Sequence, residues 1–255
     1  MPEGYFLRAF DVLDSSNTEC HRRVEAGENG PLWVVTDQQS AGRGRRGRQW
    51  VSKKGNLFAS LLYPISCDVM TASGLSFVAA LAIQEMLADV LQSKERVKCK
   101  WPNDILVDGK KISGILLESA ALGGGAPGFV IIGIGINIEY HPDETLYSAT
   151  NIREALHGGL CSREYIFANL ASSMAHWIDK WHTQGFEHII NVWKERAMGL
   201  GEEIIVRLPN EEISGKFIDL DATGALILDA DGERRHISAG DVFFGEKFGK
   251  KFGEK

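Results

Sequence analysis

The stretch FVIIGIGINI, at residues 129–138, is apolar along almost its whole length and has glycines at positions 133 and 135. This composition predicts a strand at the centre of a β-sheet. Glycines weaken a strand, so we expect a flat ligand or a neighbouring backbone to press against these two. No G-x-G-x-x-G motif opens a helix here, which excludes a dinucleotide-binding fingerprint. Asn137 could reach a nucleotide or a metal, or it could simply cap the strand.

The segments around this stretch carry further strand and helix patterns. Strands are predicted at residues 32–36, 56–63, 97–101, 105–107 and 112–117. Asp108-Gly109, between the last two, favours positive φ and predicts a tight hairpin. Helices are predicted around residues 17–26, 73–91, 166–181 and 186–193, the second with one buried stripe. Together these elements predict an α+β fold with a mixed β-sheet flanked by helices.

The pattern changes after residue 200. Short strand-like runs separated by turn residues follow, and they predict a small all-β barrel of about fifty residues. We therefore expect a catalytic-type domain at residues 1–200 and a small β domain at residues 201–247. The segment 248–255 lacks periodicity and is predicted to be a disordered tail.

Composition limits the possible classes of protein. The 255 residues carry a net charge of −6, and 44% are hydrophobic, which is an ordinary globular balance. The amino terminus has no signal-peptide pattern, and no uninterrupted apolar run approaches the ~20 residues of a membrane span. The cysteines are scattered without metal-binding spacing, which favours reduced thiols in the cytoplasm. They are Cys20, Cys67, Cys99 and Cys161.

Four arginines and three glycines fill the seven residues GRGRRGR at 42–48. Glycines let the backbone approach a ligand, and guanidinium groups match phosphate oxygens. The motif predicts a loop that closes over a triphosphate and steadies departing pyrophosphate. A solvated basic loop, or an RGG-like nucleic-acid segment, is the alternative. RGG-like segments lie in low-complexity surroundings, however, whereas this loop lies between two predicted strands.

KWPND at residues 100–104, with Lys111 across the hairpin, is a second polar cluster. Pro102 fixes a bend that points Asn103 and Asp104 out of the sheet. Asp104 could hold Mg²⁺, which favours carboxylate and phosphate oxygens, or it could be an ordinary turn residue. Lys111 could stabilise charge that develops when a carboxylate attacks an α-phosphate, or it could be a solvated edge charge. The seven histidines are dispersed, so triad and zinc catalysis are not expected.

These segments, in this order, closely resemble the bacterial biotin–protein ligases. The matching segments are DSSN at 14–17, QSAGRGRRGRQW at 39–50, KWPND at 100–104, KKISGILLE at 110–118 and GIGIN at 133–137. The resemblance implies a class II synthetase-like catalytic fold with an SH3-like C-terminal barrel. It also implies a two-step reaction, in which biotin and MgATP give biotinyl-5′-AMP and pyrophosphate. A lysine of a biotin carboxyl carrier protein then takes the biotin.

The resemblance further implies roles for individual residues. The implied catalytic residues are Lys111, Arg45 and Asp104, and Asp104 is also the implied Mg²⁺ ligand. The implied biotin-binding residues are Ser15, Ser16, Asn17, Gln39, Gly42, Arg43, Arg45, Lys111 and Gly114. The implied ATP- and adenylate-binding residues are Arg43, Arg45, Arg46, Arg48, Trp50, Asn103, Lys111 and Asn137.

Two features depart from the family pattern. Ser16 stands where threonine is usual, which keeps the hydroxyl and loses only a methyl group. The motifs begin at residue 14, which leaves no room for the amino-terminal winged helix of the repressor members. The resemblance is therefore to the monofunctional type, and we expect no specific DNA or membrane binding. We expect a monomer or a weak homodimer.

Three other interpretations compete with a biotin ligase. Lipoate–protein ligases and octanoyltransferases share the fold, but the GRGRRGR and KWPND motifs favour biotin. A nucleic-acid-binding protein would use the arginines of residues 43–48 as a backbone grip, and the overall acidity argues against it. An inactive scaffold would lack some of the motifs, and none is missing.

Overall fold

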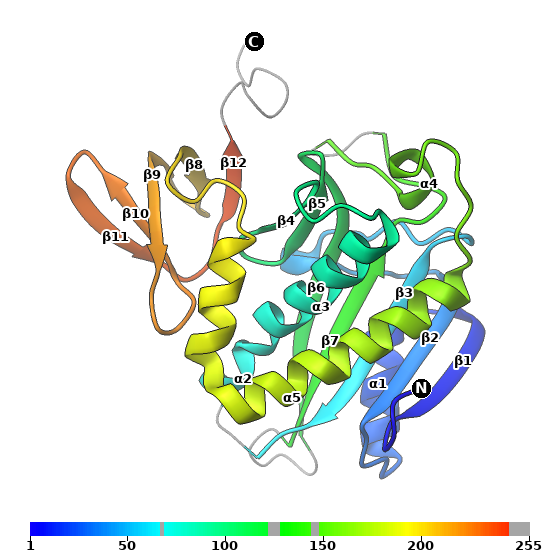
Figure 1. Cartoon of the computed structure of the whole chain (residues 1–255). Helices are drawn as coiled ribbons and strands as arrows, with labels where there is room; N and C mark the ends of the chain where they lie inside the picture. Colours follow the sequence, from blue (N-terminus) through cyan, green and yellow to red (C-terminus); the bar gives the residue numbers. More distant parts are fainter. Residues whose placement is uncertain (67–68, 122–127, 144–147, 245–255) are drawn as a thin grey trace.

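The main body of the molecule is a seven-stranded mixed sheet with helices on both faces (Figure 1). The computed structural model describes residues 1–66, 69–121, 128–143 and 148–244. The strand order is β1-β2-β3-β7-β6-β5-β4, where β1 is parallel to β2 and every other neighbouring pair is antiparallel. The strands are β1 (Phe6–Leu13), β2 (Leu32–Gln39), β3 (Leu57–Pro64), β4 (Val97–Lys100), β5 (Asp104–Val107), β6 (Lys110–Ala120) and β7 (Phe129–Ile136). β7 stands in the middle, as the sequence predicts.

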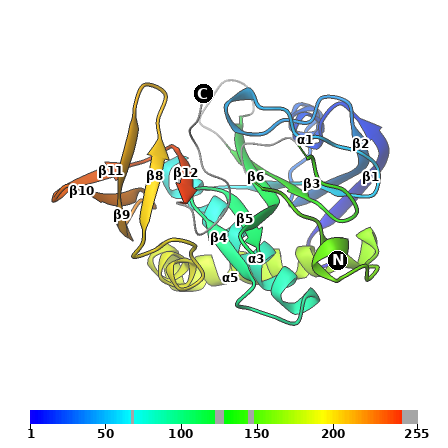
Figure 2. The ribbon, with the colours of Figure 1, turned by 90° about the horizontal axis from the view of Figure 1, so that it is seen from above.

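The helices divide between the two faces of this sheet. They are α1 (Ser16–Glu25), α2 (Val69–Ser73), α3 (Leu75–Val90), α4 (Ile152–Ala155) and α5 (Arg163–Glu195). Seen from above, α3 and α5 lie along one face and α1 lies on the other (Figure 2). Each face consequently has its own apolar core, a large one under α3 and α5 and a small one under α1.

Two of the predicted helices differ in detail from the expectation. α3 is buried nearly all round instead of along one stripe, because α5 covers the side that faces away from the sheet. α5 runs through both predicted carboxy-proximal helices and kinks between them at Gly185, where φ is 78°. By length and composition residues 71–90 could cross a membrane, but 78% of their most apolar window is buried inside the protein. Such burial is typical of a core helix.

The predicted hairpin and the reduced cysteines agree with the structure. Asp108 and Gly109 both have positive φ, 49° and 75°, as a tight turn between β5 and β6 requires. Cys20, Cys99 and Cys161 are free thiols. Cys67 lies outside the described residues.

A strand that the sequence patterns missed is β1. Six of its eight residues are exposed, because it forms the sheet edge next to β2 and little covers it. A strand that is solvated on both faces carries no alternation of apolar and polar residues, so the pattern gave no signal.

The carboxy-terminal region forms a second, antiparallel sheet. Its strands are β8 (Glu203–Arg207), β9 (Glu212–Leu220), β10 (Leu226–Ala230), β11 (Glu233–Ile237) and β12 (Asp241–Phe244). They follow the order β11-β10-β9-β8-β12. The small β unit is confirmed, but closure into a barrel is not: β11 and β12 are at opposite ends of this order, and they do not pair within the described part of the chain. The predicted tail at 248–255 lies outside the described residues.

The two sheets are joined through a buried tryptophan. Trp101 is 2% exposed, and its indole N–H donates to the backbone oxygen of Gly224 at 3.0 Å. Gly224 is itself buried, and a side chain there would collide with the ring of Phe77 at 2.6 Å. The turn between β9 and β10 is therefore packed tightly against α3 and the start of the KWPND turn.

We expect Trp101→Phe to lower the free energy of unfolding by about 1–3 kcal/mol more than Trp33→Phe does, as measured by chemical denaturation. Both changes remove similar volume from a buried site. Trp33 is a matched control, because its indole N–H has no hydrogen-bond partner within the described residues, whereas loss of Trp101 leaves the buried Gly224 oxygen unsatisfied. Equal losses would show that this hydrogen bond does not stabilise the domain contact.

Candidate active site

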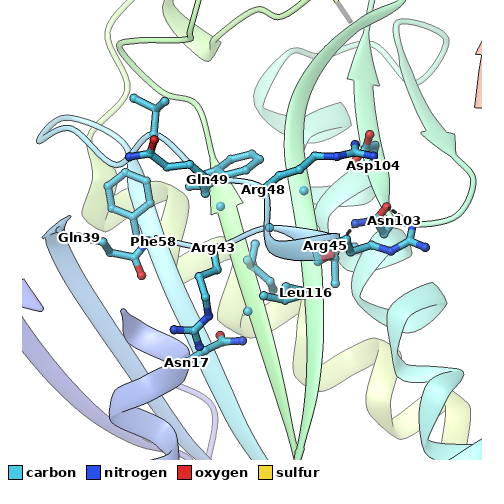
Figure 3. Close-up of a pocket in the computed structure, with 18 of the residues that line it drawn as sticks. Asn17, Gln39, Arg43, Arg45, Arg48, Gln49, Phe58, Asn103, Asp104 and Leu116 are labelled. Carbon is cyan, nitrogen blue, oxygen red and sulfur yellow. Dashed lines mark hydrogen bonds between the residues drawn. The ribbon is translucent and has the colours of Figure 1, made fainter. Parts of the chain in front are cut away.

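A cavity of about 340 Å³ lies against β6 and β7, between α1 and the KWPND turn. The Gly/Arg loop crosses over it (Figure 3). Most residues that the sequence marks as functional meet in this cavity. Those that line it are Ser15, Ser16, Asn17, Gln39, Arg43, Arg45, Arg48, Trp50, Asn103, Asp104, Lys111, Gly114 and Asn137. Two marked residues, Gly42 and Arg46, do not line it.

The floor of the cavity is formed by glycines. A Cβ at Gly133 would collide with the side chain of Asn17, and a Cβ at Gly135 would collide with the indole of Trp50. Gly114, on the neighbouring strand, leaves room for the same indole, 3.0 Å from where its Cβ would stand. A close approach to the central strand is therefore observed, but two side chains of the protein make it, in place of the flat ligand or neighbouring backbone that the sequence predicts.

A network of neutral hydrogen bonds occupies the α1 end of the cavity. The backbone N–H and the hydroxyl of Ser16 donate to Gln39 Oε1 at 2.8 and 3.1 Å. Ser60, buried on β3, donates to Ser16 Oγ at 2.7 Å or to Asn17 Oδ1 at 2.6 Å. Asn17 Nδ2 is buried and has no partner within the described residues. This end therefore offers fixed neutral donors and acceptors, which suit a polar but uncharged group.

The Gly/Arg loop is a folded lid, defined here as residues 42–50. The N–H of Trp50 donates to the oxygen of Gly42 at 2.9 Å, and that of Gly44 donates to the oxygen of Arg48 at 2.7 Å. Gly42 is packed closely, since a side chain there would meet Ser52 Oγ at 2.5 Å. The absence of a side chain at Gly42 lets the lid start beside β2, and contact of Gly42 with a ligand stays a prediction.

Two lid arginines extend across the cavity in opposite directions (Figure 3). Arg43 points towards α1, where it donates to Thr18 Oγ1 at 2.9 Å and lies 3.3 Å from Glu118 Oε1. Arg45 points towards the KWPND turn and donates to Asn103 Oδ1 at 3.1 Å. Asn103 in turn donates to the oxygen of Ile115 at 2.6 Å, so the turn and β6 are tied together.

The other two lid arginines contact the carboxy-terminal sheet. Arg46 Nη1 lies 3.2 Å from Asp241 Oδ2, and Arg48 pairs with the same oxygen. Burial alone would raise the pKa of Asp241, but the hydrogen bond from Arg48 and the charges of both arginines hold it below its usual value. Sequence reasoning missed Asp241, because an acidic residue before a short strand carries no distinctive pattern.

Charged groups are concentrated at the KWPND end of the cavity. Lys111 Nζ lies 2.6 Å from Asp104 Oδ1 and 5.5 Å from the centroid of the Trp50 ring. Asp104 is 7% exposed. Lys100 on β4 stands opposite Asp104 on β5 in the strand register and is 4% exposed. Burial lowers the pKa of Lys100 to about 7, and the charge of Asp104 partly opposes this. This end therefore carries cations together with the carboxylates of Asp104 and Asp241 in a partly dehydrated setting.

Asn137 acts as a strand cap in this structure. Its side-chain N–H donates to the oxygen of Thr150 at 3.1 Å, and its backbone N–H donates to that of Ile112 at 2.9 Å. Of the two roles that the sequence leaves open, the capping role is the one observed. The residue still lines the cavity, so contact with a ligand remains a prediction.

Comparison with known proteins identifies the family of the chain. Residues 9–137 match the biotin/lipoate A/B protein ligase family, and residues 199–245 match the biotin protein ligase C-terminal domain. The chain is 39% identical over 236 residues to the biotin–[acetyl-CoA-carboxylase] ligase of Paracoccus denitrificans, which covers 91% of this chain and 98% of that relative. It is 29% identical to the Mycobacterium tuberculosis protein of the same name, over 94% of this chain and 90% of the other.

A solved structure is also similar over most of the chain. The biotin protein ligase of Aquifex aeolicus in complex with biotin and ATP superposes with a TM-score of 0.78 at 26% identity, and the match covers 93% of this chain and 97% of the other. The chain therefore belongs to the biotin/lipoate A/B protein ligase family and, with its matching C-terminal domain, to the biotin protein ligases within it.

Proposed function

We propose that this protein is a biotin–protein ligase, which activates biotin as an adenylate and transfers it to a lysine of a biotin carboxyl carrier protein. The observation that carries the proposal is the division of one cavity. Neutral donors and acceptors lie around Ser16 and Gln39, and cations lie around Lys111 and Arg45. An uncharged ureido ring fits the first end, and a carboxylate meeting a triphosphate fits the second.

In the first step a biotin carboxylate oxygen attacks the α-phosphorus of ATP. The bond between the α-phosphorus and the oxygen that bridges it to the β-phosphate breaks, and pyrophosphate leaves with that oxygen. The ammonium of Lys111, at the junction of the two ends, is placed to stabilise the added negative charge, and Arg45 and Arg48 are placed to hold the phosphates. Binding both reactants in one cavity makes the step effectively unimolecular.

Magnesium fits the residues present, as an ion that arrives with the nucleotide. Within the described residues no group of three or more His, Cys, Asp and Glu side chains could hold a metal. Mg²⁺ is commonly bound by one or two carboxylates plus substrate phosphates, and Asp104 faces the cavity at the phosphate end. We propose Asp104 as the protein ligand, in exchange for part of its contact with Lys111.

In the second step the uncharged amine of a carrier lysine attacks the biotinyl carbonyl, and AMP leaves with the bonding electrons. The mixed anhydride hydrolyses in water, so the lid must stay closed between the steps. We propose that the partner is the carrier domain of acetyl-CoA carboxylase, that no specific DNA is bound, and that the enzyme works in the cytoplasm as a monomer or weak homodimer. We further propose residues 1–200 as the catalytic domain and 201–247 as the C-terminal one.

Biotin-dependent exchange of pyrophosphate into ATP tests the first step. We expect exchange by the wild type and a loss of about 100-fold or more in Lys111→Ala and in Arg45→Ala, because each removes a cation next to the developing charge. Lys110→Ala is the matched control, since Lys110 is the exposed neighbour of Lys111 and does not line the cavity. Exchange with lipoate in place of biotin would reassign the protein to the sister enzymes, and no exchange with either would refute the proposal.

The glycine floor generates a second prediction. We expect Gly133→Ala to weaken biotin binding by about tenfold or more, because the new methyl group displaces Asn17 from the neutral end of the cavity. Titration calorimetry with biotin alone measures this without ATP. Gly128→Ala is the control, since among the described residues a Cβ there meets nothing within 4 Å. Equal affinity in all three proteins would show that Asn17 has no part in holding biotin.

A further inference from the structure

A cluster of polar side chains surrounds Arg43 at the α1 end of the lid. Of this cluster only Arg43 lines the cavity. Glu118, near the end of β6, lies 3.3 Å from Arg43 Nη2 through one carboxylate oxygen and 3.2 Å from His21 Nε2 through the other. Thr18, one turn before His21 on α1, accepts a hydrogen bond from Arg43 Nη1 at 2.9 Å. Three elements that are distant in sequence therefore meet around one guanidinium group.

This cluster is distinct from the cavity lining. Arg43 lines the cavity, whereas Thr18, His21 and Glu118 do not. Any effect of Glu118 on a ligand must consequently pass through Arg43. The carboxylate is held by His21 on one side, so the position of its other oxygen is fixed with respect to α1, and it offers that oxygen to the lid.

The exposure of the pair decides how strong the contact is. The side chains of Arg43 and Glu118 are 42% and 24% exposed. Ion pairs at such sites contribute little, roughly 0.2–1 kcal/mol, because water competes with the contact. A contact of this strength is weak enough to open in every turnover and still strong enough to shift the lid towards its closed position.

We propose that Glu118 is a positioning residue that draws Arg43 across the mouth of the biotin end and so holds the lid closed there. Asp241 holds the opposite end of the lid through Arg46 and Arg48, which leaves Arg45 between them to face the cavity. The proposal rests on the proposed function for its effect on biotin, but the contact itself can be tested without any substrate.

The kinetic consequence is specific to one substrate. In Glu118→Gln the KM for biotin should rise roughly two- to fivefold, the range that an exposed pair of this kind supports, with kcat and the KM for ATP unchanged. Thr18→Val removes the other contact of Arg43 and should shift the same constant in the same direction. The matched control is Glu211→Gln, which breaks the exposed pair of Glu211 with Arg235 on the C-terminal sheet, and neither residue lines the cavity. Changes confined to kcat, or to the KM for ATP, would overturn the proposal.

Trypsin provides a readout that does not depend on activity, because it cuts after the lid arginines only when the lid opens. We expect the initial cleavage after Arg43 and Arg45 in Glu118→Gln, without substrates, to be roughly two- to fivefold faster than in the wild type and in Glu211→Gln. Equal rates of initial cleavage in all three proteins would refute the proposal that Glu118 holds the lid closed. If Glu118→Gln is cleaved faster but the wild type shows no biotin-dependent exchange, the contact between Glu118 and the lid is supported and the proposed ligase function is refuted.

Discussion

The arrangement of the whole site depends on the absence of side chains along the middle of the central sheet. Gly133 and Gly135 on β7 and Gly114 on β6 leave a bare strip of backbone, and Asn17 and Trp50 lie directly on it. Any Cβ on the strip would lift one of these two groups away from the sheet and change the shape of the cavity above. Glycine weakens a strand by about 0.5–1 kcal/mol relative to alanine. The large core beneath α3 and α5 supports the sheet where these residues weaken it.

The electrostatics of the site follow from how its cations are held. The protein as a whole is acidic, with a net charge of −6, yet three lid arginines and Lys111 line one cavity, and Arg46 lies on the same lid. A carboxylate lies beside most of them: Glu118 for Arg43, Asp241 for Arg46 and Arg48, and Asp104 for Lys111. These pairs keep the cations close together without substrate. A nucleotide brings its own negative oxygens, which can take over the same donors one by one.

Local sequence patterns predict those parts of this structure that depend on neighbours in the chain. The central strand and the Asp108-Gly109 turn both depend on residues a few positions apart. Nearly all residues that the motif resemblance marked line the cavity, but the resemblance did not give their partners. The contact of Arg46 with Asp241 spans 195 positions, and that of Arg43 with Glu118 spans 75. A surface carboxylate has no pattern that tells which distant cation it will meet, so Asp241 and Glu118 could be found only in three dimensions.

The contact between Asp241 and the lid also bears on how such a protein can change during evolution. Asp241 starts the last strand of the small sheet, so a side chain from one domain completes a cavity in the other. The two domains are therefore not interchangeable parts. A C-terminal sheet transplanted from a distant homologue would need an acidic residue at this position, at the start of the same strand. Without it, Arg46 and Arg48 of the lid would lose their ion-pair partner. Recombination at the domain boundary is constrained by a single carboxylate, even though the boundary itself lies far from the chemistry in sequence.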